Sequence, residues 1–153
     1  MRWREVEEGA PEFAEKVRQL FDTRKHKTLA TLRRDGSPRI SGIEVEFRDG
    51  EVWLGMMGDS LKAADVLRDP RLAVHGPTED PPEPDQSSWP GEAKLSGRAV
   101  EDGGASEGAV AEGARSFRVD IEEVVLTRLG DPADHLVIES WHPGRGLERR
   151  TRR

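Results

Sequence analysis

Three short stretches in which apolar and polar residues alternate follow one another between residues 28 and 57. The dipeptides Asp35-Gly36 and Asp49-Gly50 separate them, and Asp-Gly between two alternating runs is a strong signal for a tight hairpin turn. Alternation with a period of two places every second side chain on the same face of a strand. This part of the chain is therefore predicted to form an antiparallel meander of three strands.

The remaining sequence predicts two short helices and further strands. Pro11 suits the first turn of a helix over 11–22, whose apolar residues recur on one face. A second helix begins at Ser60 and stops near Pro70. Additional strands are predicted over 72–75, 93–101, 117–129 and 135–141, with a connection over 102–113 that holds at most one helical turn.

The pattern predicts a mainly β fold with one domain over residues 1–153. Many strands without long helices between them favour a closed antiparallel barrel of six to seven strands with short flanking helices. The segment 76–91 is rich in proline and acidic residues and contains no Lys or Arg, so we expect a long mobile loop. The basic segment 145–153 is expected to be a solvated tail.

Composition excludes several classes of function. The 24 basic and 30 acidic residues give a net charge of -6, which argues against a nucleic-acid partner. There is no cysteine for a disulfide or a thiolate, and no apolar run of a length that would span a membrane. The four histidines show no metal-ligand spacing, so no metal site is predicted. The simplest location for such a chain is the cytoplasm.

Ser60 and Lys62 form the most suggestive pair of polar residues. They follow a strand and open a helix, where free backbone N–H groups and the helix dipole favour an anion such as a phosphate. The alternative is that Ser60 only caps the helix and Lys62 is solvated. Met56 and Met57, directly upstream, are on pattern alone one core residue and one surface residue.

Several motifs in a shared order resemble the pyridoxamine 5'-phosphate oxidase-like split barrels, a family of small homodimeric flavin-binding proteins. The family's strand followed by Ser-x-Lys matches residues 52–62, and its later Leu and Asn-Pro match 66–70, where this chain has Asp-Pro. The runs 35–43, 95–101 and 137–141 resemble its second strand, the strand after its long loop and its C-terminal segment. The resemblance covers most of the chain.

The resemblance implies an FMN site at a subunit interface. Arg39, Ser60 and Lys62 would hold the phosphate, with a guanidinium fork, a hydroxyl and an ammonium group. The family's pattern also places cofactor-contacting residues next to Arg39, Ser60 and Lys62 in the strands and the helix, and in the C-terminal segment. The additional cofactor-binding candidates are Ile40, Ser41, Gly42, Ile43, Met56, Met57, Leu61, Trp141 and Arg150.

Two departures speak against pyridoxamine phosphate as the substrate. Glu44 stands where authentic oxidases of this family have Lys, and Leu61 stands where they have Arg. The chain also has no tyrosine, so the family's tyrosine-containing substrate motif is missing. We therefore expect an FMN-dependent oxidoreductase that transfers hydride to or from another small molecule, without an assigned catalytic residue. Closure of the 76–91 loop over the exposed ring face is a further expectation.

Two alternatives stay open at this point. The cofactor is the deazaflavin F420 in one of them, because related split barrels bind it. In the other, the chain is a non-catalytic barrel that stores a cofactor or mediates assembly. A homodimer is expected in each case, since a barrel of this size is too small to enclose a tricyclic ring by itself.

Overall fold

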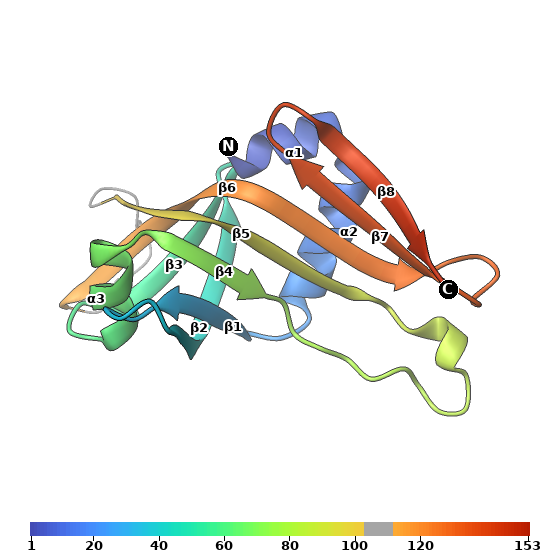
Figure 1. The fold of residues 1–153 in the computed structure, drawn as a ribbon, viewed down its shortest axis with the longest axis horizontal. Helices are drawn as coiled ribbons and strands as arrows, with labels where there is room; N and C mark the ends of the chain where they lie inside the picture. Colours follow the sequence, from blue (N-terminus) through green and yellow to red (C-terminus); the bar gives the residue numbers. More distant parts are fainter. Residues whose placement is uncertain (103–111) are drawn as a thin grey trace.

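Antiparallel strands form most of the structure, a computed structural model that describes residues 1–102 and 112–153 (Figure 1). The mainly β class and the antiparallel barrel are confirmed: of the eight strands in the described part of the chain, six form the barrel and two extend it. In chain order the elements are α1 (Trp3–Gly9), α2 (Pro11–Asp22), β1 (His26–Leu32), β2 (Pro38–Arg48), β3 (Glu51–Met57), α3 (Leu61–Arg68), β4 (Arg71–His75), the short 3-10 helix η1 (Gln86–Ser88), β5 (Glu92–Glu101), β6 (Ala114–Leu129), β7 (Leu136–His142) and β8 (Gly146–Arg152).

The barrel closes through the long strand β6. The strand order is β3-β2-β1-β4-β5-β6-β7-β8, and an additional pairing between β3 and β6 joins the ends of the first six strands into a ring. The first residues of β6 pair with β3, from Met57 opposite Ala114 to Trp53 opposite Arg118. Its last residues pair with β7. β6 is therefore both a barrel strand and the base of the β7–β8 extension.

The barrel wall separates between β2 and β3. β2 pairs with β3 only over Val45–Arg48, whereas its first part, residues 38–44, pairs with β1. The end of β3 pairs with β6 instead. Within the described residues, the first half of β2 thus has one edge without a neighbouring strand, and this edge lies beside the start of α3. Pro38 is tolerated because it is the first residue of the strand.

Alternating side chains and two helices build the core. Ile43, Val45 and Phe47 on β2 are buried, while the residues between them are exposed. The apolar faces of α1 and α2 belong to the same buried cluster, and the ring centroids of Trp3 and Phe47 lie 4.7 Å apart in an edge-to-face arrangement. None of the helices in residues 1–102 and 112–153 is long and apolar enough to span a membrane.

The sequence did not predict α1. This helix has seven residues and buries only Trp3 and Val6, so its apolar pattern is too short to stand out from the surrounding residues. Such a short helix is marginal on its own and depends on tertiary packing. Contact with Phe47 of β2 supplies that packing, because the indole ring of Trp3 is almost completely buried.

The C-terminal segment is a strand and not the expected solvated tail. β8 pairs with β7 from Leu136 opposite Arg152 to His142 opposite Gly146. Gly144 and Gly146 have positive φ angles of 76° and 72°, which allow the chain to reverse between the strands. The many arginines obscured the strand pattern, although charged residues are common on an exposed sheet edge such as this one.

The 76–91 segment crosses the surface as a long connection from β4 to β5 (Figure 1). Trp89 donates its indole N–H to the carbonyl of Glu79 at 2.9 Å, and Arg24 forms an ion pair of 3.4 Å with the Glu79 carboxylate. The expected mobility of the 76–91 segment stays a prediction. Of the expected 102–113 connection, residues 103–111 lie outside the described part of the chain.

Gly97 provides a test of the barrel geometry. It lies where the register between β5 and β6 shifts, and a Cβ there would collide with the carbonyl oxygen of Asp120. We expect Gly97→Ala to lower the free energy of unfolding by about 1–3 kcal/mol, since overpacking against backbone forces a strand to move. Gly55→Ala is the matched control, because a Cβ at Gly55 meets nothing within 4 Å. Urea denaturation that gives equal losses for both variants would contradict the register.

Candidate functional site

A groove of about 1220 Å³ crosses the outer face of the barrel beside the separated wall. It is formed by residues of β1, β2, β3 and β6, together with the segment before β1 and the first turn of α3. We call it the groove below. Its lining includes Lys25, His26, Lys27, Gly42, Ile43, Glu44, Glu46, Trp53, Gly55, Met56, Met57, Lys62, Ala114, Arg115 and Ser116.

Small residues form the floor of the groove. Gly42 on β2 and Gly55 on β3 both open onto empty space, since a Cβ at either position has no atom within 4 Å. Gly55 lies opposite Ser116 on β6, and Met57 lies opposite Ala114. Glycine inside a strand weakens it and often marks the close approach of a ligand or another backbone. The floor therefore offers a flat stretch of backbone to a planar group.

Most charged side chains in the groove neutralise one another. Lys25 approaches Glu44 at 3.3 Å, and Arg115 lies 2.6 Å from Glu101. Lys62 and Lys27 differ, because no ion pair with a carboxylate is recorded for either within the described residues. Lys27 is buried, whereas Lys62 is only partly buried and its ammonium group donates a hydrogen bond of 2.8 Å to the carbonyl oxygen of Gly42. Lys62 is thus a cation that an anionic ligand can reach without displacing a carboxylate.

The separated edge of β2 leaves backbone groups beside the groove. The Gly42 carbonyl points away from β1 and towards α3, since it accepts the hydrogen bond from Lys62. In an extended strand the N–H and C=O of one residue point to the same side. The N–H groups of Gly42 and of its neighbours Ile40 and Glu44 consequently face the side where β3 does not pair with this part of β2.

Ser60 caps α3. Its hydroxyl accepts a hydrogen bond from the backbone N–H of Ala63 at 3.3 Å and donates one to the carbonyl of Met57 at 2.7 Å. This arrangement satisfies one of the free N–H groups of the first helical turn. The capping alternative accounts for the present contacts of Ser60, and its predicted role in phosphate binding stays a prediction.

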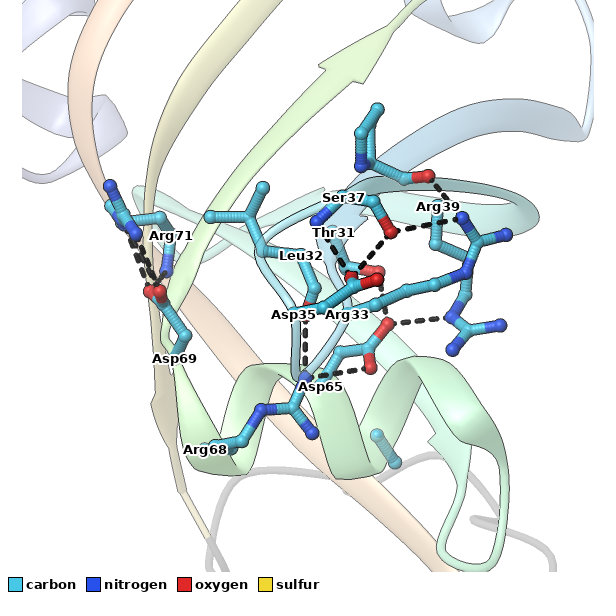
Figure 2. A network of polar contacts seen from close by, with 12 residues as sticks. Thr31, Leu32, Arg33, Asp35, Ser37, Arg39, Asp65, Arg68, Asp69 and Arg71 are labelled. Carbon is cyan, nitrogen blue, oxygen red and sulfur yellow. Dashed lines mark hydrogen bonds and ion pairs between the residues drawn. The ribbon is translucent and has the colours of Figure 1, made fainter.

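Arg39 takes part in an ion-pair network with the buried Asp65 of α3, on the side of the helix that faces the β1–β2 turn (Figure 2). Its Nε lies 2.7 Å from Oδ2 of Asp65, which is almost completely buried. Thr31 also donates to Oδ2 at 2.8 Å, and Arg68 donates to Oδ1 at 3.0 Å. Burial acts to raise the pKa of Asp65, but the hydrogen bonds from Arg39, Thr31 and Arg68 outweigh it and hold the pKa below its ordinary value.

Trp141 and Arg150 lie away from the groove within one chain. They belong to β7 and β8, which extend to the opposite end of the barrel from α3 (Figure 1). The indole N–H of Trp141 contacts the sulfur of Met1 at 3.0 Å, and its ring covers Gly9 so closely that a Cβ there would overlap it. Their predicted cofactor contacts across a dimer stay a prediction.

The groove brings together five of the twelve predicted residues. Gly42, Ile43, Met56, Met57 and Lys62 line it. The other seven do not appear in its lining, and they are Arg39, Ile40, Ser41, Ser60, Leu61, Trp141 and Arg150.

Fourteen of the nineteen lining residues were not predicted from the sequence, and four of them illustrate why. Gly55 had a signal, because it interrupts an otherwise apolar strand, whereas Lys27, Trp53 and Ser116 had none. Desolvation by burial lowers the pKa of Lys27 even though Asp22 and Glu44 act to raise it. Its ammonium group is held by the carbonyl oxygens of Arg24 and Lys25.

Comparison with solved structures identifies the fold. No family model and no curated protein matches the chain. A pyridoxamine 5'-phosphate oxidase-related, FMN-binding protein from Nostoc punctiforme superimposes with a TM-score of 0.65 at 10% sequence identity, over 94% of this chain and 96% of that one. The chain has the fold of the pyridoxamine 5'-phosphate oxidase-like split barrels. The resemblance inferred from the sequence motifs is confirmed at the level of the fold.

Other split barrels with this fold have different ligands in their names. PhzG from Burkholderia lata, solved with tetrahydrophenazine-1-carboxylic acid, has a TM-score of 0.60 at 12% identity, over 94% of this chain and 87% of its own. A heme-binding protein from Mycobacterium smegmatis has a TM-score of 0.59 at 17% identity; the match covers 90% of this chain but only 57% of that protein. The fold alone therefore does not select one cofactor or one reaction.

Asp65 makes stability depend on pH in a predictable direction. Because its pKa is lowered in the folded state, its contribution is present above the ordinary carboxyl pKa and is lost as the pH falls through the folded value. We expect Asp65→Asn to lower the free energy of unfolding by about 1–3 kcal/mol near pH 7. The difference from wild type should shrink below about pH 4.

The control for this prediction is Asp59→Asn, which changes an exposed carboxylate in the turn before α3 that has no recorded contact with the network within the described part of the chain. We expect it to alter the free energy of unfolding by less than about 0.5 kcal/mol. Urea denaturation over a series of pH values provides the measurement. A destabilisation by Asp65→Asn that is the same at pH 3 and pH 7 would contradict the assigned role of the carboxylate.

Proposed function

We propose that this protein binds FMN in the groove and transfers hydride between the flavin ring and a small substrate. The observation that carries the proposal is the pair of strand glycines, Gly42 and Gly55, which open onto the groove at the separated edge of β2. A planar ring requires such a flat surface, and the exposed backbone N–H groups of β2 are donors of the kind that the polar edge of a flavin needs. The fold shared with an FMN-binding protein supports this assignment.

The charges near the groove fit an anionic cofactor tail. Lys62 would hold the phosphate, because its ammonium group already projects to the separated edge and has no carboxylate partner recorded among the described residues. Trp53 and Met57 would contact the apolar part of the ring from either side of Gly55 on β3. Glu44 would not contribute to phosphate binding, since its negative charge repels that group and is engaged by Lys25.

The cofactor would supply the redox chemistry, and the chain would supply binding, orientation and exclusion of water. The substrate would have to stack on the ring face that the groove floor leaves open. Reduction of bound FMN by a nicotinamide donor under anaerobic conditions, followed by absorbance, tests whether hydride transfer takes place. If flavin binds tightly but neither such donors nor other small reductants reduce it, the protein binds the cofactor without transferring hydride.

Filling the floor of the groove tests the cofactor site. We expect Gly55→Val to weaken FMN binding at least tenfold, because two methyl groups would occupy the position of the ring; tenfold corresponds to about 1.4 kcal/mol. The control is Ala73→Val, which adds the same groups on the exposed face of β4 outside the groove. Quenching of flavin fluorescence gives the affinities. Equal FMN affinity in both variants would show that FMN does not bind in the groove.

A charge reversal at Lys62 tests the contact with the phosphate separately from the contact with the ring, in the same assay. Lys62→Glu is expected to weaken FMN at least tenfold but to leave riboflavin, which lacks the phosphate, nearly unchanged. Lys16→Glu on the exposed face of α2 makes the same change in net charge away from the groove. If Lys16→Glu and Lys62→Glu weaken FMN equally, only the net charge of the protein matters and Lys62 does not hold the phosphate.

We also propose that two copies of the chain associate so that each covers the other's groove. The groove is wide and open; the exposed Met57 (51% exposed) lines it, and the exposed Ile40 (74% exposed) lies two residues before Gly42 on β2. An isologous dimer would bury them and would narrow both grooves to the width of a ring. Light scattering should give twice the mass of 17.1 kDa. A monomer that binds FMN tightly would contradict the dimer.

A further inference from the structure

A second hollow, of about 560 Å³, lies between the β1–β2 turn and α3. Four arginines line it together with two aspartates, and we call it the arginine pocket. Its charged lining residues are Arg33, Arg34, Arg39, Arg68, Asp35 and Asp65. Four positive and two negative charges leave a surplus of two positive charges at this place, in a chain whose net charge is -6. The pocket is therefore an electrostatic exception on an acidic protein.

Asp65 orients two of these arginines without using all their donors (Figure 2). One carboxylate oxygen accepts from Nε of Arg39, and the other accepts from Nη2 of Arg68, which also donates to the carbonyl of Leu32 at 2.6 Å. A guanidinium group has five N–H donors. Within the described residues, the structure records no acceptor for the Nη atoms of Arg39 and no partner for Arg34.

We infer that the arginine pocket is a second ligand site and binds a polyvalent anion of the phosphate class. Two guanidinium groups fixed by a buried carboxylate are preorganised, so little side-chain entropy is lost when an anion accepts their remaining hydrogen bonds. Guanidinium forks match the oxygens of a phosphate in pairs. An anion would also relieve the repulsion among the four arginines, which the two aspartates neutralise only in part.

The site is separate from the groove, although the two are neighbours. Leu61 lines the arginine pocket and the next residue, Lys62, lines the groove. On β2, Arg39 lines the pocket and Gly42 lines the groove. The two hollows share no lining residue, so the anion is a free molecule and not the charged end of the ligand in the groove.

Binding of pyrophosphate, measured by titration calorimetry, tests the inference without any flavin. We expect saturable binding to the wild-type protein and a loss of about tenfold in affinity for Arg34→Gln, which removes one charged donor from the pocket. Arg145→Gln is the matched control, because it removes the same charge from the turn between β7 and β8. Its affinity should equal that of wild type.

Two results of the calorimetry would overturn the inference. One is the absence of saturable pyrophosphate binding to the folded wild-type protein at millimolar concentrations. The other is an equal loss of affinity in Arg34→Gln and Arg145→Gln, which would show general attraction to positive charge. Thermal unfolding of both variants in the absence of anion confirms that they are folded, as expected for substitutions of exposed residues.

Flavin titrations then separate this site from the flavin site. If Arg34→Gln changes neither FMN nor riboflavin affinity while weakening pyrophosphate, the pocket takes a free anion, which supports the inference. If it weakens FMN but not riboflavin, the pocket belongs to the flavin phosphate site, and the inference of a second ligand is wrong. Gly55→Val should leave pyrophosphate binding intact. Absence of FMN binding to the wild-type protein, with pyrophosphate binding intact, would count against the proposed function alone.

Discussion

The pairing of β3 with β6 is the interaction on which the rest of the structure depends. It closes six strands into a barrel, and it draws the end of β3 away from the beginning of β2. Closure removes sheet edges that would otherwise invite aggregation. The same pairing sets Gly55 beside Ser116 and so creates the flat floor of the groove. One contact thus explains both the enclosed core and the open surface beside it.

Local patterns in the sequence predicted the parts of the fold that local interactions determine. The two Asp-Gly turns, the alternation in β2 and β3 and the helix that begins with Pro11 all express short-range preferences. α1 and β8 were missed for a common reason: α1 forms because Trp3 packs on Phe47, and β8 forms because β7 offers an edge. Such long-range contacts do not produce a recognisable local pattern in the sequence.

The candidate site was predictable where one segment supplies it and unpredictable where several strands meet. Met56, Met57 and Lys62 lie close together in the chain, and all three line the groove. Ser116 comes from a strand far along the sequence, and only the closure of the barrel brings it there. The ligand role that its motif implied for Arg39 stays a prediction, and nothing in the sequence indicated that its Nε pairs with the buried Asp65.

The hydrogen bond from Lys62 to the Gly42 carbonyl holds α3 against the separated edge of β2. An anion that binds Lys62 in place of this carbonyl would leave the Gly42 oxygen accessible to water, so the exchange costs little in desolvation. The buried carboxylate of Asp65 cannot exchange its partners so cheaply, since burial penalises an unpaired charge. The groove and the arginine pocket therefore share α3 but differ in rigidity: Lys62 is free to follow a ligand, whereas Arg39 and Arg68 are fixed before one arrives.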